Sequence, residues 1–233
     1  MDYAPVTFLT VVFLCTANGD PSILGDHHWV FLEELAKQYI KKMNATHKGH
    51  VSTWGLTEKY SYWNYNDPPG KHPVKAKIAW TSYSECKGAS SLKTRERDCA
   101  GFFHWRISRG IKSAFSMKVE ELVPVLYSGL RRKLLKFDIN DVTEESADER
   151  WGRTTRHVRR KLVKACKFKA EINFDGYFVY TLSNPDEGNF RWILVSISQL
   201  ADSSKGLEEK GDKLSYVAKG IYVERILCYG HKK

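Results

Sequence analysis

The stretch from residue 158 to residue 198, VRRKLVKACKFKAEINFDGYFVYTLSNPDEGNFRWILVSIS, decides the fold class of this chain. It holds three runs rich in β-branched and aromatic residues, which an Asp-Gly pair and an Asn-Pro pair separate. The pattern predicts strand, tight turn, strand, loop, strand. The turn is expected at Asn173–Gly176, the second strand at Tyr177–Tyr180, the loop at Ser183–Asn189 and the third strand at Trp192–Ile197.

The composition fits one good-sized domain with an extension, or two small domains. The chain has 233 residues, 13% of them aromatic, and a formal net charge of +10. Such an excess of Lys and Arg predicts a polyanionic partner, which would be nucleic acid, heparan sulfate or an anionic surface.

The N-terminus distinguishes between these partners. An apolar run covers Val6–Ala17 and is too short to span a bilayer, while Cys15-Thr-Ala17 resembles the small-residue cleavage pattern of a signal peptide. We therefore expect a signal peptide at 1–17 and a secreted, extracellular protein. The alternative for this run is a buried N-terminal strand.

Four cysteines remain after such a cleavage, and an even number in a secreted chain predicts two disulfides with three possible connectivities. The four are Cys86, Cys99, Cys166 and Cys228, and Cys86 and Cys99, close in sequence, are the easiest pair to join. A secreted chain would also be a glycoprotein, since Asn44-Ala-Thr46 is a sequon with Asn44 as the acceptor.

Residues 18–75 are expected to form an N-terminal extension. Apolar residues at helical spacing predict a helix at about 26–43, which Asp26 can cap. The following stretch, Thr46–Lys75, is rich in Trp, Tyr, Gly and Pro and is expected to be irregular. Its aromatic side chains are expected to pack on the core, with sugar stacking as the alternative, and they are Trp54, Tyr60, Tyr62, Trp63 and Tyr65.

From Val74 onward the pattern is mostly that of strands. Two of them are expected at Phe115–Leu126 and Leu130–Phe137, and Asp141–Thr155 is expected to be an insertion between strands.

Several motifs in this part resemble those of the fibroblast growth factors, in the order in which that family has them. The resemblance covers about residues 99–225. Its marks are Cys166 and Phe168, the acidic Glu171, Tyr177 and Tyr180 at ungapped spacing from the cysteine, Trp192, the segment Cys99–Ile107 with a glycine turn at Gly110, Val123-Pro-Val125, Arg132–Leu135 and Val217–Arg225.

The resemblance implies an all-β protein, with a β-trefoil of about twelve short strands at 76–230. It also implies a growth factor-like ligand that binds and activates a receptor tyrosine kinase of the fibroblast growth factor receptor type. Heparan sulfate proteoglycan would be the co-receptor. Neither a nucleic-acid partner nor membrane insertion is expected.

The family's functional residues fall at two places in this sequence. The receptor contacts would be Glu171, Asp175, Gly176 and Tyr177, although Tyr177 fits packing against the domain equally well. The heparin contacts would lie in a basic run and a C-terminal loop, at Arg156, Arg159, Arg160, Lys161, Lys164, Lys205, Lys210, Lys213 and Lys219. For the basic run the alternative is a solvated strand face. Cys166, Phe168 and Trp192 are expected in the core.

Two other functions stay open at this point. One is a secreted glycan-binding or matrix module without signalling, and the other is an intracellular nucleic-acid binder, should 1–17 not be a signal. An enzyme comes last, because the sequence has no Gly-x-Ser-x-Gly, no His-Glu-x-x-His and no Gly-rich phosphate loop. No cofactor and no metal are expected.

Overall fold

The structure is a computed structural model, and it describes residues 28–46, 50–89, 99–126, 132–141, 145–146, 157–184 and 189–230. The predicted signal peptide at 1–17 lies outside these residues. The strands are β1 (His28–Phe31), β2 (His50–Gly55), β3 (Lys75–Gly88), β4 (Cys99–Lys112), β5 (Lys118–Pro124), β6 (Arg132–Asp138), β7 (Glu145–Ser146), β8 (His157–Asp175), β9 (Tyr177–Asn184), β10 (Asn189–Ser196), β11 (Leu207–Lys210) and β12 (Lys213–Gly230). The helices are α1 (Leu32–Thr46), α2 (Tyr62–Tyr65) and the short 3-10 helices Ile139–Asp141, Ile197–Leu200 and Ser203–Lys205.

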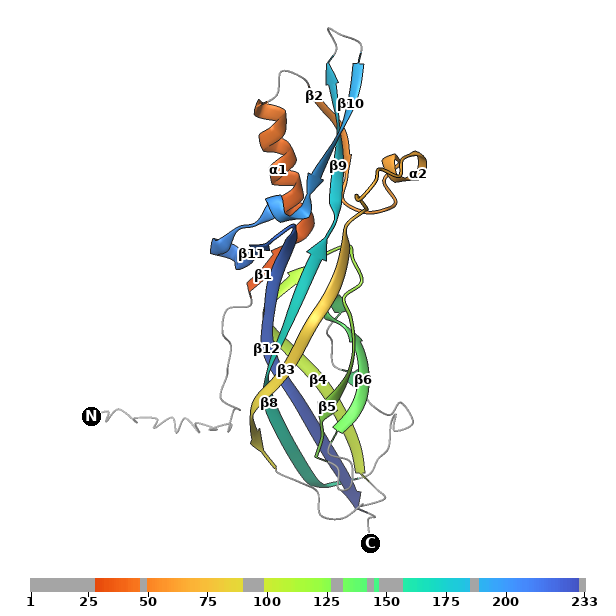
Figure 1. Ribbon diagram of the computed structural model, residues 1–233. Helices are drawn as coiled ribbons and strands as arrows, with labels where there is room; N and C mark the ends of the chain where they lie inside the picture. Colours follow the sequence, from red (N-terminus) through yellow and green to blue (C-terminus); the bar gives the residue numbers. More distant parts are fainter. Residues whose placement is uncertain are drawn as a thin grey trace, which may run out of the picture.

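The predicted all-β class is confirmed, and its main feature is one long sheet with strand order β1-β4-β12-β8-β3 (Figure 1). β11 pairs with β12 and β7 pairs with β4 at its margins. β8 has 19 residues, so it spans about 60 Å at the usual rise of a strand. The twelve-strand β-trefoil is not confirmed, because the longest strands exceed those of a trefoil and β1 pairs in parallel with β4.

The tight turn predicted at Asn173–Gly176 is wrong. β8 and β9 do not fold back on each other: β8 belongs to the long sheet, while β9 pairs with β2 and β10 in a second sheet. Gly176 has a φ of +114°, and a Cβ there would lie 2.7 Å from the Pro73 carbonyl oxygen. The Asp-Gly pair therefore marks a bend through which one strand passes from the first sheet to the second.

The second sheet, with order β10-β9-β2, forms a head at one end of the molecule together with α1 and α2 (Figure 1). Tyr39 of α1 packs edge-on against Phe178 of β9, with ring centroids 5.5 Å apart. The helix begins at Leu32 rather than at residue 26, because His28–Phe31 form β1 along the edge of the long sheet. The segment expected to be an extension thus contributes strands to both sheets.

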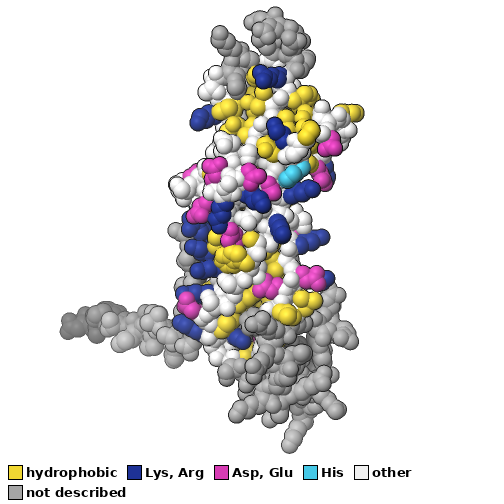
Figure 2. Space-filling model, viewed as in Figure 1, with side chains coloured by type: hydrophobic (Ala, Val, Ile, Leu, Met, Phe, Trp, Pro, Cys, Tyr) yellow, Lys and Arg dark blue, Asp and Glu magenta, His cyan; other side chains and the backbone are white. Residues whose placement is uncertain are grey.

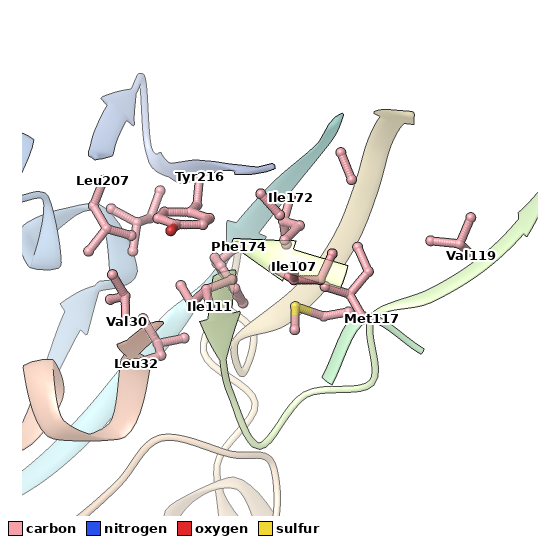
Figure 3. Packing of buried hydrophobic residues seen from close by; sticks show 14 of the residues in the cluster. Val30, Leu32, Ile107, Ile111, Met117, Val119, Ile172, Phe174, Leu207 and Tyr216 are labelled. Atoms are coloured by element: carbon pink, nitrogen blue, oxygen red, sulfur yellow. The ribbon is translucent and has the colours of Figure 1, made fainter. Parts of the chain in front are cut away.

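One core of buried apolar side chains joins these parts. Figure 3 shows its middle, where Val30 and Leu32 meet Leu207 and Tyr216, and where Met117 lies against Ile107. The predicted core residues Cys166 and Phe168 are buried, as expected.

All four predicted cysteines form disulfides, but Cys86 and Cys99 are not a pair. The bonds are Cys86–Cys166 and Cys99–Cys228. Cys99 and Cys228 are direct partners of β4 and β12 in the sheet, so strand register, rather than closeness in sequence, decides the pairing.

Candidate functional site

β5 and β6 form a two-stranded sheet of their own, which lies beside the lower half of the long sheet (green in Figure 1). Their backbones pair from Lys118 with Asp138 to Pro124 with Arg132, and with no other strand among the described residues. Two strands alone are at best marginally stable in water. This β5–β6 hairpin therefore depends on the side chains that attach it to the long sheet.

The inner face of the hairpin is apolar. Val119 and Val123 of β5 and Phe137 of β6 are buried. The ring of Phe137 stacks on Trp105 of β4, with centroids 4.1 Å apart, and lies 6.1 Å from the ring of Phe168 on β8. Alternation along each strand turns these side chains to one face.

The outer face carries an exposed apolar pair. Leu122 and Leu134 are direct cross-strand partners, and they are 52% and 50% exposed. Beside them Lys136 and Glu120 form an ion pair at 2.8 Å. The hairpin thus presents apolar groups on both faces, whereas an ordinary covering hairpin is apolar on one face and polar on the other.

At its root the hairpin is closed by two polar side chains. The Asp138 carboxylate accepts hydrogen bonds from the backbone N–H of Met117 at 3.1 Å and from the Ser116 hydroxyl at 3.0 Å. The Asn140 amide donates to the Phe115 carbonyl at 2.7 Å and accepts from the Ser113 N–H at 3.1 Å. These bonds join the two chains of the hairpin at its base and do not involve the face of the long sheet.

At the far end a buried acid fastens the hairpin to the long sheet. Glu224 of β12 is 0% exposed, and its Oε2 accepts a hydrogen bond from the backbone N–H of Leu126 at 2.6 Å. Lys164 of β8 is the direct cross-strand partner of Glu224. A carboxylate in a dry site makes a strong bond to such a donor, so this contact is the polar latch of the hairpin.

The surface under the hairpin contains polar groups as well as rings. Burial raises the pKa of Tyr83 well above its usual range, and the negative charge of Glu121 on the hairpin raises it further. The Tyr83 hydroxyl and the Trp105 indole nitrogen are neighbours without a hydrogen bond of normal geometry. Buried polar groups that lack a good hydrogen bond cost free energy, so they weaken the packing of the hairpin on the long sheet.

The β5–β6 hairpin can separate from the long sheet as a unit. Exposing Val119, Val123 and Phe137 to water costs about 5 to 9 kcal/mol in total, at about 1.5 to 3 kcal/mol for each side chain. That amount keeps the hairpin closed in solution. An apolar environment for the same side chains offsets it, while the root bonds of Asp138 and Asn140 hold the two strands together.

The residues predicted to contact a receptor lie at the junction of the two sheets, away from this hairpin. Tyr177 is half-buried beneath the Lys71 ammonium, which lies 5.4 Å from its ring centroid, and its N–H donates to the His72 carbonyl. Gly176 forms the bend described above, and Asp175 is paired with Lys213 at 3.6 Å.

Glu171 is held within the outer face of the long sheet. It accepts from Lys210 at 2.6 Å, from the Ser215 hydroxyl at 3.0 Å and from the Trp80 indole N–H at 2.5 Å. These bonds lower the pKa of the Glu171 carboxyl, and the bond from Lys210 has the largest effect. The Glu171 carboxylate is therefore occupied by donors of its own chain.

The residues predicted to bind heparin have mixed placements where the structure describes them. Lys161 is exposed, but Lys164 lies on the inner face opposite Glu224, because successive residues of a strand face opposite sides. Arg156 and the side chains of Arg159 and Arg160 lie outside the described part of the structure. In the C-terminal loop, Lys205, Lys210 and Lys213 are paired with Asp202, Glu171 and Asp175, and Lys219 is exposed on β12.

The aromatic residues of the head have mixed placements. Tyr62 is buried and Trp54 packs against the core, as expected, but Tyr65 is exposed. The prediction that Trp192 lies in the core is wrong, because its side chain is 39% exposed on β10. The ring centroids of Tyr60 and Tyr62 lie 5.7 and 5.3 Å from that of Trp192. Asn44, the predicted glycosylation acceptor, is exposed on α1, and its side chain accepts from the Val51 N–H.

Two further properties of the described residues bear on function. None of their helices is sufficiently long and apolar to cross a membrane. Within the same residues, no three His, Cys, Asp or Glu side chains gather as a metal site would require.

No protein-family model matches the chain, and no curated protein matches it. Three solved structures are similar to this chain over most of its length and of their own. The complex of Cry23Aa1 and Cry37Aa1 has 10% identity and a TM-score of 0.45, with 86% of each chain covered. A non-toxic crystal protein from Bacillus thuringiensis has 9% identity and a TM-score of 0.41, covering 86% of this chain and 94% of its own.

The third structure is the Mpp75Aa1.1 β-pore-forming protein from Brevibacillus laterosporus, with 8% identity and a TM-score of 0.23, covering 85% of this chain and 84% of its own. None of the three is a growth factor. These similarities contradict the predicted growth factor. The receptor and heparan sulfate partners and the glycan-binding alternative stay predictions. The short motifs that suggested the growth factor are strand and turn patterns, and the chain distributes them over three described sheets.

Proposed function

We propose that this protein acts on membranes by releasing the β5–β6 hairpin from the long sheet and inserting it into a lipid bilayer. The observation that carries the proposal is the hairpin itself. Among the described residues it pairs with no other strand, it is apolar on its buried inner face, and it exposes Leu122 and Leu134 on its outer face. No membrane insertion was expected, because no stretch of the sequence is long and apolar enough for a membrane helix; the present proposal inserts strands instead.

The chemistry of the strands supports insertion. Membrane-inserted strands need about 9 to 11 residues with alternate side chains turned to lipid. On the first strand the alternation extends beyond β5, since Phe115, Met117, Val119, Val123 and Val125 are apolar and half-buried or buried. On the return strand it continues through Leu135, Phe137 and Ile139. Among the side chains of this face that the structure describes, Glu121 is the charged exception.

A single inserted hairpin would leave backbone groups at its two edges without hydrogen bonds, which lipid does not supply. Hairpins from several copies of the chain would therefore pair edge to edge. The proposal thus includes assembly on the membrane and leakage of small solutes through it.

An extracellular site of action fits this proposal. The two disulfides are compatible with an oxidising compartment. The twelve-strand trefoil has no part in it, because the hairpin and the long sheet are separate sheets.

The test uses the full chain with Cys15→Ser and a single new cysteine for an environment-sensitive fluorophore. A label at Leu135→Cys, which is half-buried on the inner face that would turn to lipid, should shift to a more apolar emission when vesicles are added, and the vesicles should release a trapped dye. A label at Lys37→Cys, an exposed position on α1, should keep its aqueous emission.

The double variant Leu122→Asp/Leu134→Asp should fold normally, because both side chains are half-exposed, and should lose dye release. Val163→Asp is the matched control, since Val163 is an exposed apolar residue of the long sheet, and it should release dye as the parent chain does. No change of emission and no release from vesicles of neutral or anionic lipid would contradict the proposal.

A further inference from the structure

Three cations lie in one row across the outer face of the long sheet. Arg109 of β4 is the direct partner of Lys219 of β12, and Lys219 is the direct partner of Lys169 of β8. Direct partners on neighbouring strands are close enough to repel each other when their charges are alike. Figure 2 shows Lys and Arg side chains gathered over the middle of this face.

None of the three takes part in an ion pair within the described residues. Lys167, two residues from Lys169 on the same strand, is by contrast paired with Glu85 at 2.6 Å. The nearby carboxylate of Glu171 is already occupied by Lys210. The row is thus a concentration of positive charge that no ion pair balances within the described part of the chain.

These cations line a shallow pocket of about 340 Å³. Trp80, Val217 and the Ser215 hydroxyl form further parts of its wall, and Glu208 is the acid that lines it. Three cations and one carboxylate leave two net positive charges. Trp80 is 42% exposed, so an apolar surface lies next to this charge.

Arg109 is held in place rather than free in solvent. Its Nη2 lies 3.2 Å from the position that a Cβ on Gly206 would take. Its charge also partly offsets the rise that burial causes in the pKa of Tyr216. A guanidinium fixed in this way is prepared for a bidentate contact with an oxyanion.

We propose that this pocket binds a phosphate monoester, with Arg109, Lys169 and Lys219 around the phosphate and Trp80 against the organic group that carries it. A phosphate monoester has about −1.5 to −2 charges at pH 7, which matches the net charge of the pocket. The group could belong to a soluble molecule or to a lipid headgroup. Only the lipid form rests on the proposed membrane function.

The test titrates the full chain with inorganic phosphate and with glycerol 3-phosphate in a calorimeter, and then measures sedimentation with vesicles. The vesicles are phosphatidylcholine with or without phosphatidic acid, whose headgroup is a phosphate monoester. The parent chain should bind a soluble phosphate, or phosphatidic acid vesicles, or both. Arg109→Gln and Lys219→Gln should each weaken this binding about tenfold or more.

Lys167→Gln is the matched control, because it removes one charge from the same face outside the pocket, and it should bind as the parent does. Binding of soluble phosphate identifies a free ligand, and binding of phosphatidic acid vesicles alone identifies a lipid. No binding in either form, or equal weakening by Lys167→Gln, would overturn the inference. Phosphate binding without any shift of the Leu135 label would leave the phosphate pocket supported and contradict hairpin insertion.

Discussion

The molecule contains two hairpins that differ in how they are held. β9–β10 pairs with β2 as a third strand, lies against α1 through Phe178 and Tyr39, and has Tyr60 and Tyr62 over Trp192. β5–β6 has no third strand among the described residues and is held by an apolar face and one buried carboxylate. The first hairpin is part of a sheet, whereas the second only rests on one.

This difference has a physical consequence for local stability. Backbone hydrogen bonds to a third strand must all break together before β9–β10 can leave, while β5–β6 can leave with its own ladder intact. Local openings of a protein follow such units. The β5–β6 hairpin is therefore the part that can move as a body without unfolding the rest.

The largest expected contrast comes from removing one phenylalanine from each hairpin. Phe178→Ala should lower the free energy of unfolding of the whole protein by about 3 to 5 kcal/mol, because the fully buried Phe178 joins the head to the core. Phe137→Ala removes a similar area, but its loss should appear mainly in β5–β6. Native-state hydrogen exchange and thermal unfolding measure both.

In Phe137→Ala, amides of β5 and β6 should exchange about a hundredfold faster, which corresponds to about 3 kcal/mol, while amides of β9 and β10 keep their rates. Dye release from vesicles should rise, since the closed state is weakened. Equal acceleration in both hairpins would show that the two do not open independently.

A smaller effect is expected from the latch. Glu224→Leu leaves the Leu126 N–H buried without an acceptor, which costs about 1 to 3 kcal/mol, and hairpin amides should exchange faster. Glu224→Gln keeps an acceptor of the same shape and should lie between the parent and Glu224→Leu. If Glu224→Gln behaves as Glu224→Leu does, the charge beside Lys164, rather than the hydrogen bond to Leu126, holds the strands.

The smallest expected effect on stability comes from Glu171, on the outer face of the long sheet. Because the folded-state pKa of Glu171 is lowered below its usual 4.5, its contribution to stability is present above pH 4.5 and is lost as the pH falls through the folded-state pKa. Glu171→Gln should lower the free energy of unfolding by about 1 kcal/mol or less at pH 7. Unfolding with denaturant across pH 2 to 7, a range set by about two units around the usual pKa, should show the two chains converge in acid. β5–β6 exchange should not change.

The sequence predicts the strands of this protein better than their partners. The runs at Phe115–Leu126 and Leu130–Phe137 were expected as two strands. The first contains β5 and the second contains β6 except for its last residue, Asp138, because alternation and β-branched residues are local signals. The Asp-Gly pair before Tyr177 is also a local signal, and it misled, since Gly176 bends a strand between two sheets instead of reversing it.

The candidate site could not be predicted from the sequence for a related reason. Of the row Arg109, Lys169 and Lys219, only Lys219 was among the predicted heparin contacts. The three residues come from strands that are far apart in the chain, and only register brings them together. The latch between Leu126 and Glu224 spans 98 residues. The sequence also could not show that Leu122 and Leu134 are exposed. Their neighbours Val123 and Leu135 are apolar too, so the pattern does not tell which of the two faces is buried.

The long pairing of β8 with β12 closes loops of very different length at its two ends. Phe174 pairs with Leu214 at the head end, while His157 pairs with Gly230 at the far end, where more of the chain lies between the partners. The longer loop loses more entropy when it closes. The disulfide Cys99–Cys228 lies near this far end, so its bond restricts the unfolded chain where restriction helps most and stabilises the lower sheet on which the hairpin lies.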